Sequence, residues 1–115
     1  MLKGIGIDII EIERVAEAVK KYGAKFLAKV YTPHEITYCT KRKKLRFPEL
    51  AARFAAKEAY AKAIGEGITT WTGIEVRNEA SGKPYLMIKG KKAANAAISL
   101  SHSRDYAVAA VYVTD

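Results

Sequence analysis

The pattern of apolar and polar positions predicts strands at both ends of the chain and a helix after the first strand. Residues 3–10 form an apolar run interrupted by one aspartate, which is typical of a largely buried strand. Apolar residues then recur at helical spacing over residues 12–22, and Gly23 provides a helix stop. Near the other end, the alternating runs 98–102 and 106–113 predict a closing hairpin.

Two further helices are predicted by the residues at their starts. Residues 32–35 read Thr-Pro-His-Glu, a capping box with proline at the first helical position, so a helix should run from Pro33 toward Lys41. Pro48 opens a longer, alanine-rich helix, and Gly65 closes it. Three helices therefore follow the first strand in succession.

The rest of the chain predicts a second hairpin. Residues 74–77 alternate in polarity, a turn follows at Ser81-Gly82-Lys83-Pro84, and residues 85–88 return antiparallel. We expect a short helix over residues 91–97. This order predicts an α+β fold of helices packed on an antiparallel sheet. Because the sequence has no repeat or linker-like tract, we expect a single domain over residues 1–115.

The predicted helix 53–65 carries the most informative chemistry, a single acid among cations. Helical spacing places Glu58 one turn from Lys62, with Arg53 and Lys57 in the adjacent row. Such a set suits a site that holds a hard metal ion and phosphate oxygens, because Mg²⁺ is commonly bound by one or two carboxylates plus substrate phosphates. The alternative is a Glu58–Lys62 pair on a solvated face, worth about 0.3–0.5 kcal/mol.

Composition narrows the class of protein. Half of the residues are hydrophobic and 28% are charged, which predicts a globular chain. The net charge of +8 indicates an anionic partner, either nucleic acid, a phosphate-rich cofactor or an acidic protein. The single cysteine, Cys39, excludes an internal disulfide and fits the reduced cytoplasm, and we interpret it as a small buried hydrophobe. Since no apolar run approaches the ~20 residues that span a bilayer, we expect no membrane partner and a cytoplasmic location.

Four segments, taken in order, resemble the holo-acyl-carrier-protein synthases, the small 4'-phosphopantetheinyl transferases. They are GIGIDIIEI at residues 4–12, RFAAKEA at 53–59, GKP at 82–84 and ISLSHS at 98–103. The likeness extends from Gly4 to about Val113, nearly the whole chain. Single motifs such as GxD would be weak, but the ordered set is specific.

The resemblance implies an enzyme. Members of this family move 4'-phosphopantetheine from coenzyme A to a serine of acyl carrier protein and release adenosine 3',5'-bisphosphate, with Mg²⁺, in support of fatty acid biosynthesis.

Asp8 and Glu58 fall on the family's metal ligands, and Glu58 is also a candidate general base. Asp8 lies in an apolar strand, where a carboxylate is costly unless it is paired or bound to metal; a structural role at the strand end is the alternative. Lys62 should reach the pyrophosphate as a point charge. The predicted catalytic residues are therefore Asp8, Glu58 and Lys62.

The resemblance also assigns residues to the coenzyme A site. They are Arg53, Lys57, Lys62, Gly65, Lys83, Pro84, Ser101 and His102. Simpler alternatives remain for several: Lys57 is equally well explained as an exposed helix cation, Pro84 as a turn former, and His102 as a structural residue. Glu35 falls in a segment similar to the family's F-x-x-R-x-x-T-x-x-E, where Lys29 replaces the usual arginine, but its capping-box role explains it without chemistry.

Two predictions concern protein partners. The resemblance makes Arg14 a docking residue for the acidic helix of the carrier protein, while the cluster Lys41–Lys44 could serve docking, the cofactor's 3'-phosphate, or only a solvated turn. Residues 106–113 are apolar on both faces, and a strand of this kind needs cover on both sides. The resemblance makes that cover a homotrimer with active sites between subunits. The alternative is a monomer whose own helices cover the sheet.

Two other classes of function are alternatives to the transferase. A nucleic-acid-binding module fits the charge of +8, but the sequence has no recognition-helix, RNP-like or zinc-finger pattern. A noncatalytic nucleotide-binding domain explains the helix cations but gives Asp8 no purpose. The transferase accounts for both, and we expect no nucleic-acid partner.

Overall fold

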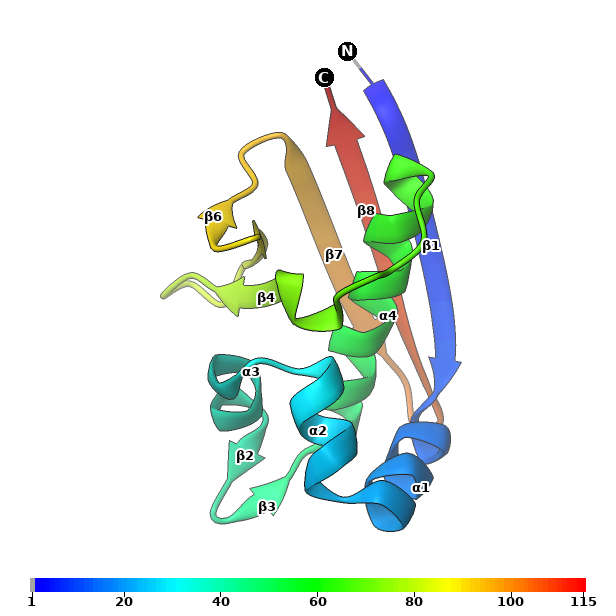
Figure 1. The fold of residues 1–115 in the computed structure, drawn as a ribbon, viewed down its shortest axis with the longest axis vertical. Helices are drawn as coiled ribbons and strands as arrows, with labels where there is room; N and C mark the ends of the chain where they lie inside the picture. Colours follow the sequence, from blue (N-terminus) through cyan, green and yellow to red (C-terminus); the bar gives the residue numbers. More distant parts are fainter. Residues whose placement is uncertain (1) are drawn as a thin grey trace.

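The computed structural model describes residues 2–115 and confirms the α+β fold. Its centre is a three-stranded antiparallel sheet in the order β1 (Leu2–Glu11), β8 (Tyr106–Thr114) and β7 (Ala96–His102). The long helix α4 (Phe47–Ile64) lies along one face of this sheet (Figure 1). The strands at the two ends of the sequence therefore pair with each other, as their apolar patterns allow.

The remaining elements pack around α4. At one end of the helix lie α1 (Ile12–Tyr22), α2 (Ala24–Val30), α3 (Pro33–Tyr38) and the hairpin β2 (Thr40–Lys41) and β3 (Lys44–Leu45). Beside its middle lie the turn η1 (Trp71–Gly73) and a small antiparallel sheet of β4 (Ile74–Asn78), β5 (Pro84–Ile88) and β6 (Lys91–Lys92). Among residues 2–115, no helix is long and apolar enough to cross a membrane.

The structure adds one helix that the sequence did not predict and corrects two local predictions. Gly23 ends α1 as predicted, but a separate helix, α2, follows at once. The capping box at Thr32 and Glu35 forms as predicted, yet α3 stops at Tyr38 because the basic cluster turns in the β2–β3 hairpin. The predicted helix 91–97 is wrong: residues there pair with β5 or begin β7, so tertiary pairing overrides local helix propensity.

Two glycines let α4 approach β1 backbone to backbone. A Cβ added at Gly6 would lie 1.9 Å from the carbonyl oxygen of Ala59, and one at Gly4 would lie 1.8 Å from that of Ala63. Only glycine fits such an approach, because any side chain would collide with the helix backbone. The close packing brings Asp8, on the same face of β1, beside the middle of α4.

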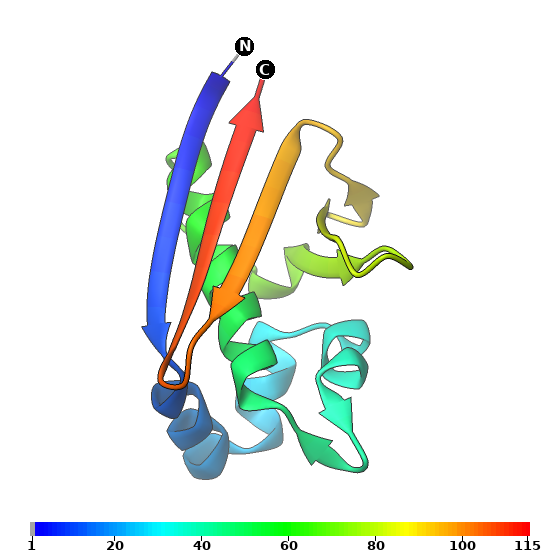
Figure 2. The same cartoon turned by 180° about the vertical axis from the view of Figure 1, so that it is seen from behind.

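The opposite face of the central sheet is apolar and exposed. Ile5, Ile7 and Ile9 are 68%, 63% and 62% exposed, and Ile5 stands opposite Tyr112 in the antiparallel register. Figure 2 shows this face with α4 behind it; no helix within residues 2–115 lies over it. Strand β8 is apolar on both faces, as predicted, but one chain buries only the face that contacts α4.

Candidate active site

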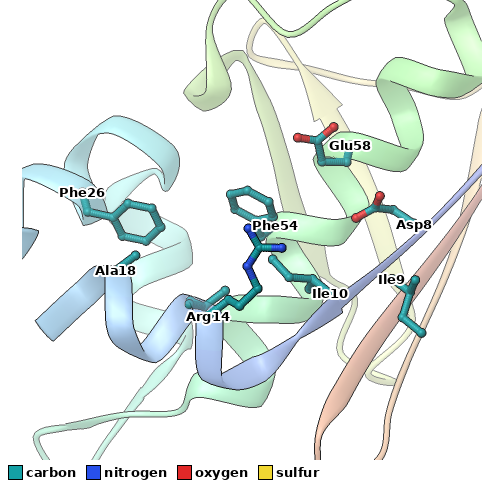
Figure 3. A pocket seen from close by; sticks show the side chains of 9 residues that line it. Asp8, Ile9, Ile10, Arg14, Ala18, Phe26, Phe54 and Glu58 are labelled. Atoms are coloured by element: carbon teal, nitrogen blue, oxygen red, sulfur yellow. The ribbon is translucent and has the colours of Figure 1, made fainter. Parts of the chain in front are cut away.

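The two predicted metal ligands line one groove. Asp8 extends from β1 and Glu58 from the middle of α4, and both line a cavity of about 510 Å³ between these elements and helices α1 and α2. Figure 3 shows the two carboxylates directed into the groove, with Arg14 and the rings of Phe26 and Phe54 at its other side. Residues distant in sequence therefore line one groove.

Electrostatics couple this pair to Lys62. The Lys62 ammonium lies 3.1 Å from the Asp8 carboxylate and donates a hydrogen bond to the carbonyl oxygen of Ile7 at 3.0 Å, while its side chain stays 55% exposed. Partial burial, followed by the negative charge of Asp8, raises the pKa of Glu58, and Lys62 opposes that shift. Two neighbouring carboxylates and one exposed cation suit a site for a hard divalent cation and phosphate oxygens.

A second cavity lies elsewhere and collects most of the predicted coenzyme A ligands. It measures about 420 Å³. Its lining includes Arg53, Lys83, Pro84, Ser101 and His102. Since three of these five residues are potential cations, the cavity suits an anionic ligand.

Arg53 forms the buried base of this second cavity. Its side chain is 1% exposed, donates to the Asn78 side-chain oxygen at 2.7 Å, and has its guanidinium carbon 4.3 Å from the centre of the Tyr38 ring. The Glu49 carboxylate lies 3.7 Å from Arg53 and 3.5 Å from the His102 imidazole. These contacts fix the direction of the guanidinium before any ligand arrives.

Helix α4 separates the two cavities. Glu58 and Arg53 are five positions apart, which turns their side chains about 140° from each other around the helix. The adjacent residues Arg53 and Phe54 face different cavities. Gly65 caps α4 in the left-handed conformation, with φ of 73°, three residues beyond Lys62. One chain therefore does not bring all the predicted ligands into one cavity.

The structure corrects the expected role of Lys57. Its side chain is fully buried, and its ammonium lies 2.8 Å from a Glu35 carboxylate oxygen. It also donates to the carbonyl oxygens of Val30 and Trp71, at 2.7 and 3.1 Å. Because all three of its protons are used inside the core, Lys57 has no surface to offer to coenzyme A.

Several residues of the two cavities were missed by sequence reasoning. Glu49 stands four residues before Arg53 on one helix, so its pairing could have been found from spacing. Asn78 and Tyr38 meet Arg53 only through tertiary packing, as Phe26 meets the carboxylate groove, and no local pattern marks them.

Comparison with known proteins defines the family. The model of the 4'-phosphopantetheinyl transferase superfamily matches residues 4–111. The holo-[acyl-carrier-protein] synthase of Halothermothrix orenii is 46% identical over 121 residues, covering 96% of both chains. This chain belongs to the 4'-phosphopantetheinyl transferase superfamily.

Solved structures agree in fold. The holo-[acyl-carrier-protein] synthase of Neisseria meningitidis superposes with a TM-score of 0.87 at 32% identity, covering 100% of both chains. That of Bacillus anthracis, determined in complex with CoA (3',5'-ADP), gives a TM-score of 0.84 at 39% identity, covering 98% of this chain and 96% of the other. The predicted resemblance and the predicted fold are both confirmed.

Proposed function

We propose that residues 1–115 form a single holo-[acyl-carrier-protein] synthase domain. It transfers 4'-phosphopantetheine from coenzyme A to a serine hydroxyl of apo-acyl carrier protein. The observation that carries this proposal is the groove in which Asp8 and Glu58 meet beside Lys62 and Arg14. Family membership and the names of the relatives support it.

The reaction exchanges one phosphorus–oxygen bond for another. The serine oxygen attacks the phosphorus that carries pantetheine, the bond from that phosphorus to the bridging oxygen breaks, and adenosine 3',5'-bisphosphate leaves. Glu58 would accept the serine proton as general base; its pKa is raised only while no cation is bound. Lys62 neutralises the phosphate oxygens, while Asp8 holds its ammonium in position.

Asp8 and Glu58 would also hold Mg²⁺. Two carboxylates of different elements, facing one groove, fit a magnesium site whose other ligands are phosphate oxygens and water. When bound, the cation neutralises charge on the pyrophosphate oxygens. The raised pKa of Glu58 supports this assignment, because partial burial and, after it, the negative charge of Asp8 disfavour the ionised carboxylate, and a bound cation would favour it.

The second cavity would receive the nucleotide end of coenzyme A. Arg53, Lys83 and His102 supply positive or hydrogen-bonding groups there, and the Bacillus anthracis relative was determined with CoA (3',5'-ADP). Because α4 separates this cavity from the carboxylate groove, we infer that each active site combines the groove of one chain with the second cavity of a neighbour.

A homotrimer accounts for this division and for the exposed sheet face. The apolar face of β1 and β8, with Ile5, Ile7 and Ile9, would be buried between subunits. Light scattering at micromolar concentration tests the assembly: three chain masses are expected. A mass of one chain, together with full activity, would rule out shared sites.

Arg14 would receive the acidic carrier protein at the edge of the groove. It is exposed and lines the same cavity as the carboxylates, so a docked acidic helix would place its serine near Glu58. The cytoplasmic location and the role in fatty acid biosynthesis belong to the same proposal.

Mass spectrometry of an apo-acyl carrier protein tests the function directly. Incubation with this protein, coenzyme A and Mg²⁺ should add the mass of phosphopantetheine to the carrier, and Glu58→Gln should abolish the gain. Glu17→Gln, on an exposed position of α1, is the matched control and should leave the gain intact. An unmodified carrier with the wild-type protein would refute the proposed function.

A further inference from the structure

The buried pair of Lys57 and Glu35 is not used by the proposed reaction. Both side chains are 0% exposed, and the Lys57 ammonium lies 2.8 Å from the Glu35 carboxylate. Burying two charges is costly, and such a pair contributes little net stability compared with well-packed apolar residues. The pair is therefore better explained by the segments that it joins than by its contribution to the free energy of unfolding.

Glu35 connects three segments. One oxygen accepts from the backbone N–H of Thr32 at 2.9 Å and from Lys57, while the other accepts from the backbone N–H of Val76 at 2.9 Å. Lys57 also donates hydrogen bonds to two backbone carbonyl oxygens, that of Val30 at the end of α2 and that of Trp71 in η1. The ion pair thus ties α2, α3, η1 and β4 to α4.

Two of these segments support the wall of the carboxylate groove. The Trp71 ring stacks on the Phe54 ring, with centroids 4.7 Å apart and planes at 27°, and Phe54 lines the groove with Glu58. The second aromatic ring of the groove, Phe26, lies on α2 and meets Tyr31, just beyond Val30, edge to face at 6.2 Å. Both aromatic side chains are thus linked to Lys57 through one neighbouring ring.

We propose that the Lys57–Glu35 pair is a positioning unit that holds α2 and Trp71 against α4, and thereby sets the aromatic wall where the carrier protein engages. This inference rests on the proposed function of the groove. It assigns Lys57 to the carrier side of the reaction, because Lys57 makes no contact with the second cavity. Lys57 and Glu35 touch no reacting atom, so they position other residues rather than act in the chemistry.

The first test uses the only tryptophan of the chain, Trp71, as a reporter that needs no activity. The double variant Lys57→Met/Glu35→Gln removes both charges, so it leaves no unpaired ion in the core and is the variant expected to fold. Its Trp71 emission should shift to longer wavelength, and acrylamide should quench it more strongly. Lys91→Met, at an exposed position of β6, is the control and should leave the emission unchanged.

The second test is steady-state kinetics of the same proteins. The double variant should raise the KM for apo-acyl carrier protein about tenfold, because the aromatic wall has moved, with little change in the KM for coenzyme A. Unchanged Trp71 emission, an unchanged carrier KM, or an equal rise in both KM values would each overturn the proposal. If the wild type modifies no carrier, the proposed function fails, while the emission experiment still decides whether the pair positions Trp71.

Discussion

At the scale of single residues, the two carboxylates of the groove illustrate how function opposes stability. Asp8 is paired with Lys62 at 3.1 Å, but Glu58 is partly buried beside Asp8, and these causes raise its pKa. A raised pKa means that folding favours the protonated acid, so the ionised form at neutral pH is a cost to the folded state. Residues whose pKa is shifted in this way are characteristic of sites that bind a cation or transfer a proton.

Glu58→Gln should therefore abolish transfer while leaving thermal stability equal or higher at neutral pH. The stabilising contribution of a raised acid pKa is complete below the unfolded value, about 4.5, and is lost as the pH rises through the folded value. The variant should therefore be more stable than the wild type at pH values above the folded pKa of Glu58. This difference in stability should vanish below about pH 4.5. Melting curves of both metal-free proteins across pH test this; a variant that is less stable at neutral pH would contradict it.

Arg14→Glu should weaken the binding of carrier protein far more than the binding of coenzyme A. Arg14 is exposed at the edge of the groove, and charges at such positions act mainly on encounter. The KM for carrier should rise for the variant, and the wild-type KM should rise with added salt because screening weakens the same attraction. An unchanged carrier KM would move the docking surface to Lys41–Lys44, the next basic cluster.

At the scale of elements, the packing of α4 on β1 decides whether the groove exists. The helix is rich in alanine, and the facing strand has Gly4 and Gly6, so the two backbones can touch. A larger residue at either glycine would move Asp8 away from Glu58. The Lys57–Glu35 pair performs a related task on the other side of α4, where it joins α3 and η1 to the helix.

Gly6→Ala should destabilise the protein and reduce transfer together. The new methyl group would lie 1.9 Å from the Ala59 carbonyl oxygen, and overpacking of this kind costs about 1–3 kcal/mol of the free energy of unfolding. Gly67→Ala is the matched control, since a Cβ there meets open space. Urea unfolding of the two variants should separate them, and equal stabilities would contradict the close approach.

At the scale of the whole molecule, one chain presents two incomplete sites and an uncovered apolar sheet. The carboxylate groove and the second cavity lie on different faces of α4, and Ile5, Ile7 and Ile9 point away from the helix. Closed symmetry offers a common solution, because each subunit covers the sheet and completes the site of its neighbour. These three features support a closed oligomer with shared sites, and the family resemblance is what makes the proposed oligomer a trimer.

Mixing two inactive variants tests the shared site directly. Glu58→Gln damages the groove, and Lys83→Ala damages the second cavity. If each site takes one half from each of two chains, coexpressed variants should recover about a quarter of the wild-type activity, because one interface in four has both halves intact. If both halves belonged to one chain, the mixture would stay inactive, as each variant is alone.

The sequence by itself determined the local elements and the family. Apolar alternation placed β1, β7 and β8, the capping box placed the start of α3, and proline and glycine bounded α4, because each of these signals acts over a few residues. Ordered motifs located Asp8 and Glu58. Local patterns fail where pairing between strands dominates: of residues 91–97, the first two pair in β6, the last two begin β7, and a turn joins them instead of the predicted helix.

Only the tertiary structure decided which charged residues are free to act. Arg53, Lys57 and Lys62 look alike in the sequence, yet Lys57 is sealed in the core by Glu35, Arg53 faces the second cavity, and Lys62 stands at the carboxylate pair. The burial and contacts of each side chain depend on where it lies around α4 and on partners 22 to 54 positions away in the sequence. Burial and long-range contact are properties of the packed chain, so the division of the site into two cavities could emerge only there.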